Sequence, residues 1–122
     1  MEQVSSGWSM AAAGAGVRGS LRSAREAGER VGVFACSDEM ASGVYAAAAT
    51  LGMTIPRDVM VVGFDDVREA RWLAPPLTTV RQPIRAMAAA AVALLDSIEG
   101  RLDAADDVVL PTSLVVRAST GP

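Results

Sequence analysis

The sequence contains no lysine and no histidine, so arginine supplies all 11 of its basic residues. Without lysine, the chain can build neither the P-loop site of nucleotide hydrolases nor a Schiff-base nucleophile. Without histidine, it lacks the base of the usual serine and cysteine triads. A zinc site would depend on Cys36 and carboxylates alone, which is unusual for zinc. We therefore expect a protein that is not an enzyme and that uses no cofactor or metal.

Cysteine and long apolar runs are also scarce. The single cysteine, Cys36, cannot form a disulfide within the chain, which fits the reducing cytoplasm, and it lies in an apolar stretch where we expect it to be buried. No run of about 18 apolar residues is present, so the sequence predicts no membrane-spanning helix. The first residues carry no secretory leader pattern. With a net charge of −3 and no arginine cluster, the chain is not expected to hold DNA by itself.

The residues that are present predict one α/β domain or part of a larger one. Hydrophobic residues make up 51% of the 122 positions, with few aromatics among them, so the core must consist of Ala, Val, Leu and Met. Ser9 and Gly28 bound a predicted helix, whose glycines at 14, 16 and 19 would allow close packing against a sheet. A strand at 31–36, a helix from Ser37 to Gly52 and a strand at 59–64 follow.

The strand at 59–64 is almost wholly apolar, which is typical of a central parallel strand covered on both faces. A strand, a helix and a strand in this order form a right-handed βαβ unit. Asp65 and Asp66 follow the second strand directly. Ligands of open α/β sheets bind beyond the carboxyl ends of the strands. The acidic tip is therefore a candidate binding site, although acids also occur in ordinary solvated loops.

The second half of the sequence continues with an extended segment and a third helix. Pro75 and Pro76 favour an extended path, along which we expect the bulky Trp72 to pack. Pro83 fits the first turn of a helix over about 84–99 that carries a broad apolar stripe. Two short extended pieces around Pro111 complete the pattern.

Five segments in this order and spacing resemble the LacI/GalR family of bacterial transcriptional repressors over nearly the whole chain. They are Phe34-Ala-Cys-Ser-Asp-Glu-Met-Ala-Ser-Gly43, Ile55-Pro-Arg-Asp-Val59, Val62-Gly-Phe-Asp-Asp66, Pro75-Pro-Leu-Thr-Thr-Val-Arg-Gln-Pro83 and Leu110-Pro-Thr-Ser-Leu-Val-Val-Arg117. The resemblance is to the C-terminal part of the effector-binding domain.

This resemblance implies a three-layer, parallel-sheet lobe of the periplasmic-binding-protein-like type I fold over residues 1–122, without the second lobe and without the helix-turn-helix domain that reads operator DNA. It implies a homodimer and a small effector, a sugar or similar metabolite, in the cleft between two lobes. The helix at about 84–99 would pack on the missing lobe. In this chain we expect it to dock on its own lobe, to swap with another copy or to be poorly ordered.

The resemblance also implies the roles of four residues. Asp65 matches the family carboxylate that accepts hydrogen bonds from the effector; otherwise it would cap the following turn. Trp8 matches an aromatic that stacks on the effector, although Gly7 stands where the family usually has an acid. Ser37 matches a position at the cleft edge and would otherwise be a plain helix cap. Gln82 lies at the lobe crossing and could reach the cleft. Asp66 is expected mainly to hold the loop.

Three alternatives remain open. A sugar-binding component of a transporter shares the fold and would differ by a cleavable leader. An enzyme could hold Mg²⁺ on Asp65 and Asp66, but the chain has no lysine or histidine to steady developing charge. The chain could also simply dimerise, since this lobe contributes to a two-fold interface in the family.

Overall fold

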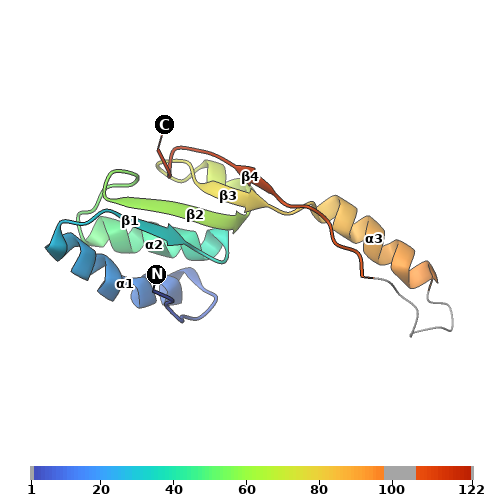
Figure 1. Ribbon diagram of the computed structural model, residues 1–122, viewed down its shortest axis with the longest axis horizontal. Coiled ribbons are helices and arrows are strands. Elements are labelled where there is room, and N and C mark those ends of the chain that lie inside the picture. The colour runs from blue at the N-terminus through green and yellow to red at the C-terminus, as the bar shows by residue number, and fades with distance from the viewer. Residues whose placement is uncertain (1, 98–106, 122) are drawn as a thin grey trace.

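The computed structural model describes residues 2–97 and 107–121, and over these residues it shows a sheet in the order β1-β2-β3-β4 (Figure 1). The strands are β1 (Val31–Phe34), β2 (Val59–Asp65), β3 (Thr78–Arg81) and β4 (Ser113–Val115). β1, β2 and β3 run parallel, and β4 is antiparallel to β3. The α/β class and the central parallel strand ending in Asp65 are thus confirmed.

Helices α1 (Met10–Ala27) and α2 (Asp38–Thr50) lie together below the sheet in Figure 1. Ser9 caps α1 and Gly28 ends it with φ 69°, as predicted. The two helices approach closely at Gly14 and Gly43, where an added Cβ on either would collide with backbone of the other helix. Gly14 therefore allows contact with α2, and the expectation that it packs on the sheet is wrong.

The core lies between the sheet and these two helices. Val59 and Val61 of β2 are fully buried on this side, with Leu21 of α1 and Ala41 of α2 against them. Burying an aliphatic side chain contributes about 1.5–3 kcal/mol, so this small-residue core can hold the lobe together. The buried core cluster consists of Ala, Val and Leu residues with Met53, and it contains no aromatic residue, as the composition predicts.

The opposite face of the sheet is only partly covered among the described residues. Phe34 of β1 is 61% exposed, and Val62 beside it is half-buried. Met60, Val62 and Phe64 of β2 are only half-buried, so the prediction that both faces of the strand at 59–64 are covered is wrong for this face. Cys36, expected to be a small core residue, is exposed. An apolar run signals a buried strand, but it does not reveal which element supplies the cover.

Beyond β2, the chain forms a short 3-10 helix, η1 (Arg68–Arg71), before the two prolines. Ala70 of η1 and Leu77 are buried in the core. Trp72 is 74% exposed, so the expected packing of this indole beside the prolines is wrong. Among the described residues, no helix is long and apolar enough to cross a membrane.

Helix α3 (Ile84–Ser97) extends away from the sheet, and the segment from Asp107 returns alongside it (Figure 1). The helix was predicted over about 84–99; residues 98 and 99 lie outside the described residues. Side chains of α3 and of the returning strand, including Met87, Leu94 and Leu110, line a shared hollow. The alternative in which this helix docks back on its own lobe is wrong.

Candidate functional site

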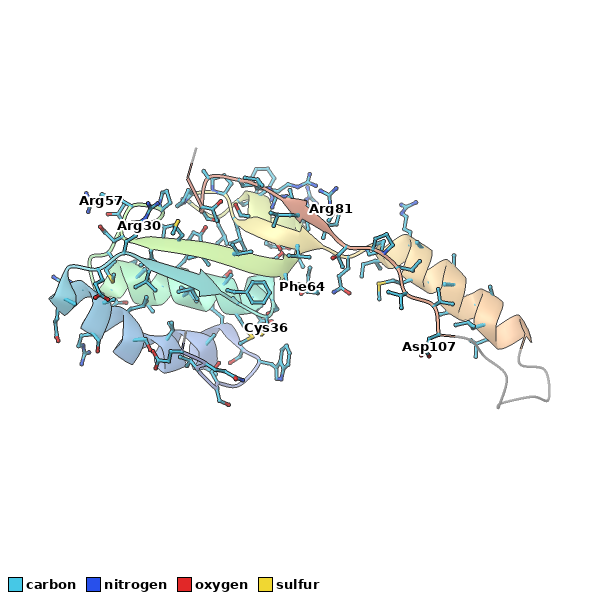
Figure 2. The ribbon with its side chains drawn as sticks, in the orientation of Figure 1. Arg30, Cys36, Arg57, Phe64, Arg81 and Asp107 are labelled. Carbon is cyan, nitrogen blue, oxygen red and sulfur yellow. The ribbon has the colours of Figure 1, made fainter. Side chains whose placement is uncertain are left out.

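The carboxyl ends of the three parallel strands meet at one edge of the sheet. β1 leads to Ser37, β2 ends at Asp65 and β3 leads to Gln82. Figure 2 shows Cys36, Phe64 and Arg81 toward this edge, with Arg30 and Arg57 at the opposite end of the sheet. The predicted polar positions of three separate segments are therefore gathered where open α/β sheets bind their ligands.

Asp65 and Gln82 are in direct contact at this edge. The Gln82 Nε2 atom donates a hydrogen bond to Asp65 Oδ1 over 2.6 Å. The Asp65 backbone has φ 115° and Asp66 has φ 55°, both in the region that favours glycine. Such conformations cost on the order of 1–3 kcal/mol each and persist where the surroundings impose them. Asp65 is thus held in a strained, defined position.

Asp65 borders two hollows. One has a volume of about 410 Å³ and includes Met10, Ser37 and Glu69 among its lining residues. The other, of about 470 Å³, lies toward α3 and includes Gln82, Ile84 and Arg85. A carboxylate between two hollows can accept hydrogen bonds from a polar molecule in either one.

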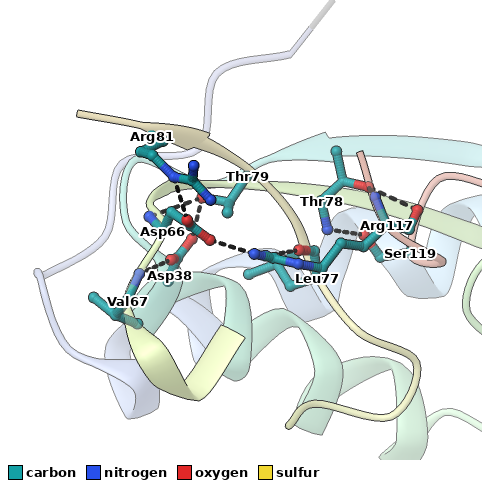
Figure 3. A network of polar contacts seen from close by, with 9 residues as sticks. All are labelled: Asp38, Asp66, Val67, Leu77, Thr78, Thr79, Arg81, Arg117 and Ser119. Atoms are coloured by element: carbon teal, nitrogen blue, oxygen red, sulfur yellow. Dashed lines mark hydrogen bonds and ion pairs between the residues drawn. The ribbon is translucent and has the colours of Figure 1, made fainter. Parts of the chain in front are cut away.

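The loop that carries Asp65 is fixed by a buried carboxylate (Figure 3). Asp38 is 2% exposed. Its Oδ1 accepts a hydrogen bond from Thr79 Oγ1 (2.6 Å) and its Oδ2 accepts one from Val67 N (2.9 Å). Thr79 Oγ1 in turn accepts one from Asp66 N (3.3 Å). Burial raises the pKa of the Asp38 carboxyl above its usual value, although these hydrogen bonds oppose the rise.

Asp66 forms the second part of this network. Its side chain is 3% exposed and forms ion pairs with Arg81 (2.6 Å) and with Arg117. Burial acts to raise the pKa of the Asp66 carboxyl, but the hydrogen bonds from Arg117 and Arg81 outweigh it and hold the pKa below its usual value. The prediction that Asp66 mainly holds the loop is confirmed by these contacts.

The four predicted site residues lie in different settings. Asp65 and Gln82 are bonded to each other, and Ser37 shares a hollow with Asp65. Ser37 Oγ accepts a hydrogen bond from Met40 N, so it caps α2, which is the alternative considered for it. Trp8 is 76% exposed and comes two positions before Met10, which lines the same hollow as Asp65. The effector contacts of all four residues stay predictions.

Three residues of this site, Asp38, Thr79 and Arg117, were not predicted from the sequence. Asp38 looks like a first-turn acid that favours the helix dipole, and nothing local shows that it turns into the core. Its partners Val67 and Thr79 are 29 and 41 residues away along the chain. Gly63 offered one signal, because an added Cβ there would collide with Asp38 Oδ1.

No group of three or more His, Cys, Asp or Glu side chains that could hold a metal ion is found within residues 2–97 and 107–121, and this includes the acids at this edge. Their oxygens accept hydrogen bonds from hydroxyl, amide and guanidinium groups instead. What the edge offers chemically is a set of fixed acceptors and donors, which suits binding of a polar molecule.

A mostly parallel sheet with fixed polar groups at its carboxyl edge is the arrangement of α/β lobes that bind small molecules. The family described as periplasmic binding protein-like domain matches residues 3–120. The chain is 42% identical over 88 residues to the lactose operon repressor of Rhizobium radiobacter, an alignment that covers 71% of this chain and 77% of that protein. The chain belongs to the periplasmic-binding-protein-like family, and within it to the LacI-type transcriptional regulators.

Two further relatives are longer than the segment that matches this chain. It is 48% identical over 89 residues to the HTH-type transcriptional regulator MalR of Streptomyces coelicolor, covering 72% of this chain and 26% of that regulator. The crystal structure of a LacI family regulator from Enterococcus faecium with bound ribose superimposes with a TM-score of 0.79 at 29% identity. That match covers 98% of this chain and 43% of the other. The chain thus spans about a quarter of the length of MalR.

Proposed function

We propose that this chain is the effector-sensing lobe of a LacI-type transcriptional regulator, and that its effector is a sugar or a similar hydroxylated metabolite. The observation that carries the proposal is Asp65, a carboxylate in a strained conformation at the end of the central parallel strand, between two hollows. Relatives of the chain are named as regulators of sugar operons, and one neighbouring structure holds ribose.

The proposed contacts follow from the chemistry of these side chains. A carboxylate accepts short, strong hydrogen bonds from hydroxyl groups, and Asp65 has lone pairs beyond the one engaged by Gln82. The Gln82 amide can add a donor and an acceptor at the same point, and Ser37 a hydroxyl at the cleft edge. Trp8, with its exposed indole, would stack on the apolar face of a sugar ring.

In the full-length regulator, effector bound between two lobes would bias their closure and thereby the spacing of DNA-reading domains. A ligand can shift this equilibrium only by its difference in affinity for the two states. We propose that the regulator acts as a cytoplasmic homodimer without catalysis, and that it contacts operator DNA through a domain other than this lobe.

The test is titration of the isotope-labelled chain with ribose and with lactose, followed by amide NMR. We expect sugar-dependent shifts at Ser37, Asp65 and Gln82. The affinity should be weak because one lobe supplies only part of the contacts. A millimolar Kd corresponds to a binding free energy of about 4 kcal/mol. Asp65→Asn keeps the size of the side chain but removes its charge, and we expect it to abolish these shifts.

Asp107→Asn is the matched control, because it makes the same change at an exposed aspartate on the returning segment beside α3. It should leave the sugar response unchanged. Shifts centred on another part of the surface, or an undiminished response in Asp65→Asn, would contradict the proposal. Sub-micromolar binding by this chain would contradict the expectation that the second lobe contributes much of the affinity.

A further inference from the structure

Asp38 is a buried carboxylate that the proposed effector contacts do not use. It is 2% exposed, and among the described residues none of the ion pairs involves it. Burying a charged group without an opposite charge is costly. Serine at position 37 already caps α2, so capping does not require Asp38. The place of this buried carboxylate therefore indicates a role in holding the nearby backbone in a defined conformation.

The hydrogen bonds of Asp38 converge on the backbone just after Asp65. Val67 N donates to Asp38 Oδ2 directly. Asp66 N donates to Thr79 Oγ1, whose hydroxyl donates to Asp38 Oδ1 (Figure 3). The two successive N–H groups that follow Asp65 are thus both bound to one carboxylate, one of them through a hydroxyl.

This is the segment in which the backbone is strained. Asp65 and Asp66 have φ values of 115° and 55° without being glycine. Two acceptors fixed to α2 and β3 supply the restraint that such a conformation requires. Room for Asp38 is provided by Gly63 of β2, where any side chain would collide with its Oδ1. Residues of β2, α2 and β3 therefore fit together around a single turn.

We propose that Asp38, acting through Thr79, is a positioning residue of the effector site. It holds residues 65–67 in the conformation that directs the Asp65 carboxylate toward its hollows. The inference rests on the proposed function, because positioning matters only if Asp65 contacts the effector. Asp38 itself accepts hydrogen bonds from the protein and contributes to binding indirectly.

The experiment compares Thr79→Val, Thr79→Ser and Asp38→Ala in the full 122-residue chain. Two quantities are measured: the three-bond HN–Hα couplings and amide shifts of Asp65 and Asp66 without ligand, and the response to ribose and lactose. Thr79→Val keeps the shape but loses the hydroxyl, so both couplings should change and the sugar affinity should fall about tenfold. Asp38→Ala should do the same. Thr79→Ser, which keeps the hydroxyl, should restore both quantities.

Asp58→Ala is the control variant. It tests whether loss of any aspartate that accepts a backbone hydrogen bond would have the same effect as loss of Asp38. Asp58 also accepts a backbone hydrogen bond, from Thr54 N over 2.7 Å, but lies just before β2, at the end of this strand opposite to Asp65. It should leave the couplings of Asp65 and Asp66 unchanged. Couplings that stay at their wild-type values in both Thr79→Val and Asp38→Ala would overturn the inference, and Thr79→Val decides it if Asp38→Ala does not fold. Absence of any sugar response in the wild-type chain would instead count against the proposed function, because the couplings are read without ligand.

Discussion

The pKa values of Asp38 and Asp66, two aspartates of this site, are shifted in opposite directions. Burial raises the pKa of Asp38, so between its usual and its raised value the folded chain binds more protons, and stability falls as the pH rises. For Asp66, burial opposes the change, but hydrogen bonds from Arg117 and Arg81 lower the pKa. Its contribution to stability is therefore complete above the unfolded value of about 3.9 and is lost as the pH falls through the folded pKa.

The contribution of Asp66 can be measured by substitution. Asp66→Asn removes the charge that Arg81 and Arg117 share, and we expect a loss of about 1.5–3 kcal/mol in the free energy of unfolding at pH 7. The difference between variant and wild type should shrink below about pH 4 as Asp66 protonates. Denaturant unfolding at several pH values measures it, with Asp107→Asn as the exposed control. A difference independent of pH would show that the ion pairs do not stabilise the fold.

At the scale of elements, β2 requires a glycine for a steric reason. Gly63→Ala would place a Cβ against Asp38 Oδ1 and within 2.9 Å of Leu77 Cδ2. Overpacking of this kind costs about 1–3 kcal/mol, and we expect that loss in the free energy of unfolding measured with denaturant.

Gly32→Ala is the matched control, since Gly32 also lies in a parallel strand but has nothing within 4 Å of its added Cβ. It should change stability little. Equal losses in the two variants would mean that replacing any glycine in these strands is destabilising, and that the close contact with Asp38 is not the cause.

Local signals in the sequence were sufficient to predict the helices and strands, and to place Asp65 in the site. Apolar runs, Ser37 and Gly28 predict the strands and helix ends, and Asp65 is the last residue of β2, one position beyond the predicted end of that strand. The exposure of Phe34 was not predictable, because hydrophobicity does not show whether a covering element is present. The role of Asp38 was missed since it depends on Val67 and Thr79, which only the folded chain brings close.

At the scale of the whole molecule, the isolated chain leaves α3 with little to pack on. Ile84, Val92 and Leu95 of this helix are 58%, 58% and 70% exposed. A helix of 14 residues is marginal in water without packing of its apolar side. We propose the reason that the resemblance implies, namely that this helix would pack on a second lobe.

Hydrogen exchange provides the corresponding measurement. In the monomeric chain we expect amides of α3 to exchange much faster than those of α2, a helix of 13 residues that packs in the core. Light scattering on the same sample establishes the oligomeric state. Equal protection of the two helices in a monomer would contradict the expectation, whereas protection that rises with concentration would indicate exchange of α3 between copies.

Asp66 is bonded both to Arg81, at the outgoing end of β3, and to Arg117, on the returning segment after β4. One carboxylate therefore ties the last residue of β3 to the segment that follows β4. Arg81 also pairs with Ser113 of β4, so the point where the chain leaves the sheet for α3 and the point where it returns lie side by side. Asp65, whose carboxylate we propose contacts the effector, is adjacent to this tie, so loss of the Asp66 charge would loosen the junction beside the proposed site.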